Sequence, residues 1–202
     1  MPFIALLATG MVTGAMSGGF EWLYPLQLVS VAYVLWIFRK SYSALHWRLS
    51  LPATTIGIGV AAIWIALAPA DISDKSAWPS ALASVPVHWA VAWLLARLAG
   101  FIILAPIVEE LAFRGFLARR IIDGEFERVP LGTFSWRSLV VSSVLFGAMH
   151  GRLWIVGTVA GMLFAVALYR RSSLGDAVQA HATANAAIAL YVMTTGRWSV
   201  WS

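Results

Sequence analysis

The second half of the sequence places a small set of ionisable and amide side chains inside otherwise apolar segments. These residues are Glu109, Glu110, Arg114, His150, His181 and Asn185. An ionisable group in a membrane-spanning segment costs about 2.5–3.5 kcal/mol on insertion scales, so each one calls for a reason. Carboxylates, imidazoles and a carboxamide are the groups that general acid–base catalysis and oxyanion stabilisation require. The set therefore indicates acid–base chemistry.

The first group is the run Glu109-Glu110-Leu-Ala-Phe-Arg114. Residues four apart share a helical face, so we expect Glu110 to pair with Arg114. Glu109 points about 100° away, and two adjacent carboxylates in a low-dielectric site do not both ionise easily. We therefore expect Arg114 to keep Glu110 charged, and Glu109 to be available as a general base. The alternative is a helix end at the membrane interface, with charges that reach water.

Two further groups follow on later apolar segments. Phe146 and His150 lie four residues apart on one face of a predicted helix, where a lone histidine is otherwise a hydrogen-bonded packing residue. His181 and Asn185 have the same spacing and are surrounded by alanines, which let neighbouring helices approach closely. This second pair could instead bond across a helix interface. All three groups, in this order on separate segments, are difficult to explain by packing.

The composition places this chemistry in a lipid bilayer. The 202 residues are 60% hydrophobic and 11% charged, whereas soluble domains are about 25% charged. These values exclude a disordered regulator, a nucleic-acid binder and a disulfide scaffold. The net charge of +5 comes from basic residues in short loops between apolar runs, which is a pattern of membrane topology. The absence of cysteine excludes thiolate catalysis and Cys-based metal sites.

The elements that must position these residues are about seven membrane-spanning helices, with six to eight possible. A helix needs roughly 20 apolar residues to cross the hydrocarbon. The predicted spans are 3–20, 24–38, 51–70, 86–108, 138–151, 153–169 and 177–194. The predicted fold is all-α, a polytopic transmembrane helix bundle that forms a single integral-membrane domain over residues 1–202. Because Glu109 would lie at the end of its span and His150 deeper, we expect a helix boundary near residues 97–100.

Basic residues in alternate loops predict the orientation of the spans. The Arg-rich loops are expected to be cytoplasmic, which gives an integral protein of the inner, or cytoplasmic, cell membrane. Arginine outnumbers lysine by twelve to two, which is typical of a GC-rich bacterial genome. His46 and His88 fall near span ends and are most simply interfacial. Arg97 is expected to snorkel or to pair at a helix end.

The three motifs together resemble a known family. Glu-Glu-x-x-x-Arg, Phe-x-x-x-His and His-x-x-x-Asn are similar to the motifs of the CPBP family of CAAX proteases and bacteriocin-processing enzymes. This is also called the Abi family, and it contains the type II CAAX prenyl endopeptidase. The resemblance covers about residues 101–195, the expected catalytic core, and Leu174-Gly-Asp176 resembles the approach to the last motif. Asp123–Phe126 and Gly196-Arg-Trp are more weakly similar to CAAX-protease-related proteins of bacterial exosortase systems.

The resemblance implies an intramembrane glutamate protease that hydrolyses a peptide bond with activated water. Glu109 would be the base that deprotonates water, and His150 would position this water and share its proton. The implied oxyanion donors are His181 and Asn185. The implied supporting residues are Glu110, Arg114 and Phe146. The expected partners are the lipid bilayer and a peptide or protein with a C-terminal or membrane-proximal tail, with no nucleic acid and no cofactor.

Two alternatives stay open at this point. Glu109, His150 and His181 would make a His₂Glu set with water as fourth ligand, as in thermolysin-type zinc sites, and so a zinc-dependent membrane protease. No HExxH motif is present, and Asn185 is a poor metal ligand but a good amide donor. The second alternative is a non-catalytic immunity or scaffold protein of the same family, in which the cluster would serve proton movement.

Overall fold

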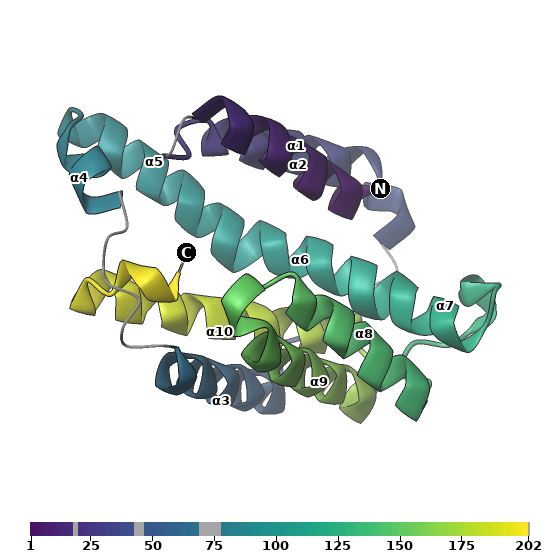
Figure 1. Cartoon of the computed structure of the whole chain (residues 1–202). Coiled ribbons are helices and arrows are strands. Elements are labelled where there is room, and N and C mark those ends of the chain that lie inside the picture. The colour runs from purple at the N-terminus through teal and green to yellow at the C-terminus, as the bar shows by residue number, and fades with distance from the viewer. Residues whose placement is uncertain (18–19, 43–46, 69–77, 202) are drawn as a thin grey trace. The chain divides into compact units, whose positions relative to one another are not determined.

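The computed structural model describes residues 1–17, 20–42, 47–68 and 78–201, and over these ranges the chain is helical without any β-strand (Figure 1). The α-helices are α1 (Pro2–Ser17), α2 (Tyr24–Ile37), α3 (Leu51–Leu67), α4 (Trp78–Ala83), α5 (Val87–Ala99), α6 (Ala105–Glu110), α7 (Ala118–Ile122), α8 (Trp136–Ala148), α9 (Trp154–Arg171) and α10 (Leu174–Thr195). The all-α prediction is confirmed. The short helix α4 was not among the predicted elements.

Each predicted span overlaps a helix, and two helical runs are long and apolar enough to cross a membrane. These runs are Val87–Ile122 and Gly151–Arg171. The shorter apolar helices are Pro2–Ser17, Tyr24–Ile37, Leu51–Leu67 and Trp136–Ala148. Residues 18–19 of the first predicted span, residues 69–70 of the third, and His46 lie outside the described residues.

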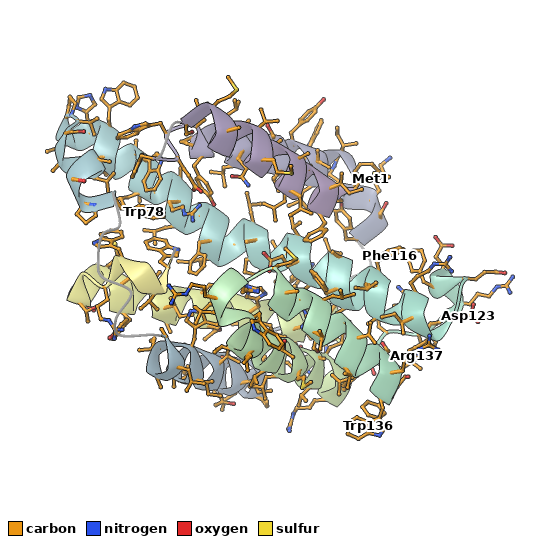
Figure 2. The ribbon with its side chains drawn as sticks, in the orientation of Figure 1. Met1, Trp78, Phe116, Asp123, Trp136 and Arg137 are labelled. Atoms are coloured by element: carbon orange, nitrogen blue, oxygen red, sulfur yellow. The ribbon has the colours of Figure 1, made fainter. Side chains whose placement is uncertain are left out.

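Large apolar side chains are exposed on the outside of several helices (Figure 2). Trp136 at the start of α8 is 72% exposed, and Phe116 is 45% exposed. Soluble proteins rarely expose large contiguous apolar surfaces, whereas a helix that faces lipid does so by necessity. The exposed apolar faces therefore agree with a helical bundle of an integral-membrane protein.

The α-helix α5 ends at Ala99, within the predicted boundary at residues 97–100, but the expected break is absent because the helical run continues from Val87 to Ile122. What changes is the hydrogen bonding, since Gly100–Leu104 and Leu111–Leu117 are π-helical segments on either side of α6. A π turn closes its hydrogen bonds five residues apart, and such turns are frequent at functional sites. The last two residues of α6 are Glu109 and Glu110. The run thus changes its helical register on both sides of the two carboxylates.

The chain divides into two compact units. Unit 1 comprises Met1–Ser43, Pro69–Val108 and Ala189–Ser202, and unit 2 comprises Ala44–Ala68 and Glu109–Ile188. Every predicted site residue belongs to unit 2. A single integral-membrane domain over the whole chain stays a prediction.

Unit 1 packs aromatic rings around an arginine. Tyr24 and Trp93 are buried together, and Trp78 meets Trp93 edge-on with 5.1 Å between ring centroids. The guanidinium carbon of Arg97 lies 4.4 Å from the Tyr24 ring centroid and 4.9 Å from that of Trp78. Arg97 Nη1 is 3.0 Å from Glu21 Oε2. Arg97 therefore forms a predicted ion pair, although the helical run does not end there.

Unit 2 brings α8 and α9 together at glycines. A side chain at Gly147 would meet the backbone of Trp154 and Thr158, and a Cβ at Gly157 would stand 3.0 Å from the Gly147 Cα. Small residues at helix interfaces permit such a close backbone approach in membrane proteins. This packing fixes the end of α8, from which His150 follows.

Helix α3 is joined to α10 by the side chain of Gln179. Its Nε2 donates to the Ser50 carbonyl at 2.9 Å and to Thr54 Oγ1 at 2.8 Å, and its Oε1 accepts from the Ser50 N–H at 2.9 Å. At Gly57 of α3, any side chain would collide with the backbone of α10. These contacts hold α3 tightly against the helix that carries His181.

Candidate active site

Glu110 is the centre of a buried polar cluster. Its side chain is fully buried, and its Oε1 accepts from Arg114 Nη1 at 3.2 Å and from His181 Nδ1 at 3.0 Å. The predicted pairing of Glu110 with Arg114 is therefore present. The other oxygen, Oε2, is buried without a hydrogen-bond partner among the described residues. One carboxylate oxygen thus ties together two elements, the π segment that carries Arg114 and the helix α10.

Arg114 is enclosed between helices. Its Nη2 donates to the carbonyl oxygen of Gly161 on α9 at 2.5 Å, and its Cζ lies 4.6 Å from the centroid of the Phe146 ring. A Cβ at Gly161 would stand 3.1 Å from Nη2, so the absence of a side chain there leaves room for the guanidinium. Phe146 packs against the arginine, as its predicted supporting position requires.

His181 lies between the two carboxylates. Its Nδ1 faces Glu110, and its Nε2 is 3.9 Å from Glu109 Oε2. The ring stacks on Phe164 with 4.5 Å between centroids. An ionised carboxylate paired with Arg114 can only accept hydrogen bonds, so we assign the proton to Nδ1 from this contact. Nε2 is then the atom through which His181 can act near Glu109.

Glu109 is the more accessible of the two carboxylates. Its side chain is 13% exposed, against 0% for Glu110. Within the described chain Glu109 accepts no direct hydrogen bond, because its 3.9 Å separation from His181 Nε2 exceeds hydrogen-bond distance. Asn185 lies one turn beyond His181 on α10 and is 8% exposed. Among the described residues, the carboxylate without a direct hydrogen bond is thus the one that was predicted to be the base.

His150 lies beyond the end of α8 and not inside a helix as predicted. α8 ends at Ala148, and His150 directly precedes the 3₁₀ turn Gly151–Leu153. His150 Nδ1 is 2.9 Å from the carbonyl oxygen of Phe146. A carbonyl only accepts, so Nδ1 donates and Nε2 is left as an acceptor. The imidazole lies edge-on to Trp64, with 5.3 Å between ring centroids.

Phe146 connects the two histidines. Its ring centroid is 4.9 Å from that of His150 and 5.6 Å from that of His181. Direct polar contacts join Glu110 to Arg114 and His181, whereas His150 reaches the cluster through an aromatic ring. Contacts thus link six of the predicted residues in unit 2, with the Phe146 ring between the histidines, and Asn185 follows one turn after His181 on α10.

Residues 91–187 match the family described as Type II CAAX prenyl endopeptidase Rce1-like. This segment is an Rce1-like domain. It contains all the predicted site residues, and it agrees with the family predicted from the motifs. No curated protein and no solved structure matched the chain. The match and the apolar helices support an integral-membrane protein and, in general terms, a membrane protease.

Several residues that shape the Rce1-like site were missed by sequence reasoning. A Cβ at Gly157 would stand 3.0 Å from His150 Nδ1, and Gly161 makes room for Arg114. The pattern Gly157-x-x-x-Gly161 is a known sign of close helix packing and could have found both glycines. Trp64 and Phe164, which contact the histidine rings, carry no comparable signal in the sequence.

The zinc alternative requires three side chains of the Rce1-like domain to converge. Among the described residues, no group of three or more His, Asp or Glu side chains is placed to hold a metal ion. Nδ1 of His181 and Nδ1 of His150 are both hydrogen-bonded within the protein, so each ring could offer only Nε2. Such a contact at Nδ1 is also typical of metal-bound histidines, so the zinc alternative stays a prediction.

Proposed function

We propose that this protein is an intramembrane endopeptidase in which Glu109 activates water to hydrolyse a peptide bond. The observation that carries the proposal is the position of His181, with Nδ1 bonded to Glu110 and Nε2 3.9 Å from Glu109. One carboxylate orients the histidine, and the other is left available for chemistry. Paired carboxylates in different environments are a recurring way to separate a supporting group from a catalytic one.

In the proposed reaction, Glu109 accepts a proton from water as the water oxygen attacks the peptide carbonyl carbon. The carbonyl electron pair moves to its oxygen, which becomes the oxyanion of a tetrahedral intermediate. Protonated His181 can donate to this oxygen from Nε2, and the Asn185 amide is the second donor. The C–N bond then breaks, and the proton held by Glu109 passes to the leaving nitrogen. The products are a new carboxyl terminus and a free amine.

The remaining residues position this set. His150 keeps Nε2 as an acceptor and can receive a hydrogen bond from the attacking water, which orients its lone pair. Glu110 fixes the ring of His181, as the carboxylate of a serine-protease triad fixes its histidine. Arg114 compensates the charge of Glu110, and Phe146 packs between Arg114 and the histidines. Glu110, Arg114 and Phe146 have positioning roles, because none of these three residues needs to touch the reacting atoms.

For the substrate, we propose a C-terminal or membrane-proximal tail of a peptide or protein, presented from the side of the Arg-rich loops. The basic loops support a cytoplasmic location for that side of an inner-membrane protein. The reaction requires no cofactor, because base, water and oxyanion donors are all supplied by side chains and solvent.

The test uses the purified protein with a prenylated peptide and a panel of membrane-protein tails. Wild type, Glu109→Gln and the matched control Glu21→Gln are compared in water enriched in oxygen-18. We expect wild type and control to release a product with one labelled carboxyl oxygen, and Glu109→Gln to be slower by about 10²–10⁴-fold with its fold retained. Wild-type rates from Glu109→Gln would contradict the assignment of the base.

The same assay separates the two alternatives. Hydrolysis that survives a strong chelator argues against a zinc enzyme, whereas a loss that added zinc restores would contradict the cofactor-free reaction. If no tail is cleaved and Glu109→Gln keeps the cellular phenotype of the wild type, the non-catalytic scaffold is the correct interpretation.

A further inference from the structure

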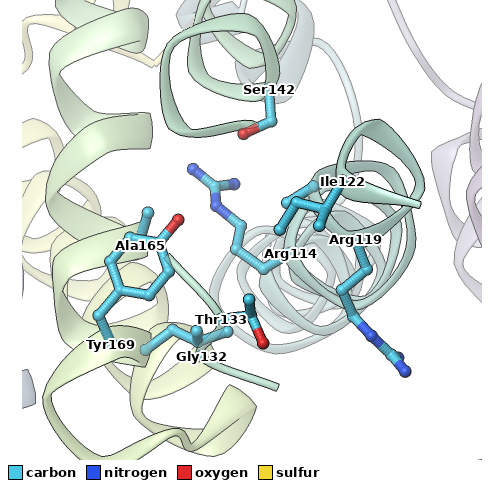
Figure 3. Close-up of a pocket in the computed structure, with 10 residues that line it drawn as sticks. Arg114, Arg119, Ile122, Gly132, Thr133, Ser142, Ala165 and Tyr169 are labelled. Carbon is cyan, nitrogen blue, oxygen red and sulfur yellow. The ribbon is translucent and has the colours of Figure 1, made fainter. Parts of the chain in front are cut away.

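Unit 2 contains a second polar site, a pocket that Glu110 and His181 do not line. Figure 3 shows it between the end of the run Val87–Ile122, α8, α9 and the loop at Gly132 and Thr133. We call it the Arg114 pocket, and it is lined by Arg114, Arg119, Thr133, Ser142, Ala165 and Tyr169, among others. Its empty volume, counted out to the open mouth, is about 310 Å³. Arg114 is the one residue of the predicted site that lines it.

Arg114 has an N–H group that the protein leaves without an acceptor. Nη1 is bonded to Glu110 and Nη2 to Gly161, whereas Nε is buried without a partner among the described residues. Figure 3 shows the Ser142 and Tyr169 hydroxyls on either side of this guanidinium. A buried donor on a charged group is costly when it is left unpaired. The pocket therefore needs an acceptor at this point.

The charge of the pocket indicates which acceptor fits. Its lining contains two arginines and no acidic residue. Arg119 donates its N–H groups to three backbone carbonyl oxygens at 2.7–3.2 Å, which uses its donors, and the Glu127 carboxylate offsets part of its charge. Glu110 compensates the charge of Arg114 only. A concave site with a net positive charge concentrates anions.

We propose that the Arg114 pocket binds one oxyanion, either the phosphate of a lipid headgroup or free phosphate. The donors are Arg114 Nε and the hydroxyl of Tyr169, because the Ser142 hydroxyl already donates to the Leu139 carbonyl at 3.4 Å. Guanidinium groups match the oxygens of phosphates, and the binding is charge-assisted. The mouth at Thr133 belongs to the loop after α7, so the anion enters from the Arg-rich side.

The site is coupled to the cluster around Glu110 through a shared guanidinium. An oxyanion at Nε competes with Glu110 for the charge of Arg114, and Glu110 in turn holds His181. Occupancy therefore loosens the histidine and lowers the rate of hydrolysis. This second step depends on the proposed function, whereas the binding itself does not.

Because the chain has no cysteine, a single introduced thiol can report on the pocket. Ser142→Cys places the thiol in the lining of the pocket. Val141→Cys is the control, because the Val141 side chain on α8 is 39% exposed and does not line the pocket. Both are treated with an anionic sulfonatoethyl and a cationic trimethylammonioethyl methanethiosulfonate in phosphate-free detergent. We expect the anionic-to-cationic rate ratio to be about tenfold higher at Ser142→Cys.

Protection then identifies the anion. Inorganic phosphate should slow the labelling of Ser142→Cys and leave that of Val141→Cys unchanged. Protection by phosphatidylglycerol nanodiscs without inorganic phosphate points to a lipid headgroup, and protection by inorganic phosphate alone points to the free ion. Equal rate ratios at the two positions would mean that the pocket takes water only, and they would overturn the proposal, as would a Ser142→Cys thiol that reacts with neither reagent.

Tyr169→Phe, made in the Ser142→Cys chain, tests the donor set. We expect it to weaken protection by phosphate severalfold, whereas Tyr33→Phe, at a position 59% exposed on α2, should not. In wild type, phosphate should inhibit peptide hydrolysis, and Tyr169→Phe should need more phosphate for the same effect. Phosphate protection without any hydrolysis would contradict the proposed function and leave the binding site intact. Unchanged protection in Tyr169→Phe would exclude its hydroxyl as a donor.

Discussion

Two arginines on the same helical run meet carboxylates in very different surroundings. Arg97 of unit 1 bonds Glu21, which is 76 positions away, and the Glu21 side chain is 47% exposed. Arg114 of unit 2 bonds Glu110 one turn away, and these side chains are 2% and 0% exposed. Both guanidiniums also lie over aromatic rings. What differs is the access of water to the carboxylate.

This difference separates an anchoring pair from a functional one. An ion pair that stays hydrated contributes about 0–1 kcal/mol and is easily replaced. Burying an ion pair completely costs a large desolvation free energy, so its presence calls for a structural arrangement that depends on both charges. Around Glu110 that geometry is the position of His181, whereas Arg97 and Glu21 hold only an aromatic cluster. The same two residue types therefore have different roles in the two units.

The largest expected effect is that of Arg114→Met. This change leaves the carboxylate of Glu110 buried and uncompensated, so we expect a loss of about 3–5 kcal/mol of unfolding free energy, measured by denaturant unfolding in detergent. The double variant Arg114→Met with Glu110→Gln should recover part of this loss, because no buried charge is then left unpaired. A single variant as stable as wild type would show that Glu110 is neutral in the native protein.

How well the sequence predicts a contact in this site depends on how many positions along the chain separate the two residues. The Glu110–Arg114 pair follows from helical periodicity alone, and the overlap of spans with helices follows from apolar runs. The bond from His181 to Glu110 could not be predicted, because 71 positions separate them and only the packing of α10 brings them together. The partner of Arg97 was hidden for the same reason.

The π segments were equally invisible to pattern reasoning. Residues 97–100 were expected to break the helix, because the depth of Glu109 did not match that of His150. In unit 1, a side chain at Gly100 would collide with the Tyr24 hydroxyl, so the glycine serves a close approach and the helix does not end. Composition suggests a break at such a glycine, and only the neighbouring ring explains why the helix continues.

A smaller effect is expected from Gly157→Ala in unit 2. The new Cβ would stand 3.0 Å from both the Gly147 Cα and His150 Nδ1, and backbone cannot yield cheaply. We expect a loss of about 1–3 kcal/mol by overpacking, together with slower hydrolysis as the His150 ring is displaced. The control is Gly14→Ala on α1, where nothing lies within 4 Å and the helix should gain slightly. Equal stability changes at both glycines would refute the close packing of α8 and α9.

Gln179→Ala should cost about 2 kcal/mol of unfolding free energy. The change removes three hydrogen bonds from α10 to Ser50 and Thr54 and leaves the Ser50 N–H unpaired, whereas the Ser50 carbonyl still accepts from Thr54. The counterpart in unit 1 is Gln27, whose Nε2 donates only to the Leu6 carbonyl at 3.1 Å, so Gln27→Ala should cost about half as much. Thermal unfolding of both variants checks which one loses more stability. A larger loss in Gln27→Ala than in Gln179→Ala would contradict the prediction.

The smallest effect is expected from Glu21→Gln, which should change the unfolding free energy by about 0–1 kcal/mol. The charge lost is that of a half-exposed carboxylate, and water already screens its attraction to Arg97. The indole N–H of Trp93 bonds the backbone carbonyl of Glu21 at 2.9 Å, so the substitution leaves this contact in place. Arg97 also keeps its position over two aromatic rings. If Glu21→Gln were as destabilising as Arg114→Met in the same unfolding assay, burial would not be the variable that distinguishes the two ion pairs. The functional role inferred for the buried Glu110–Arg114 pair would then lose its physical basis.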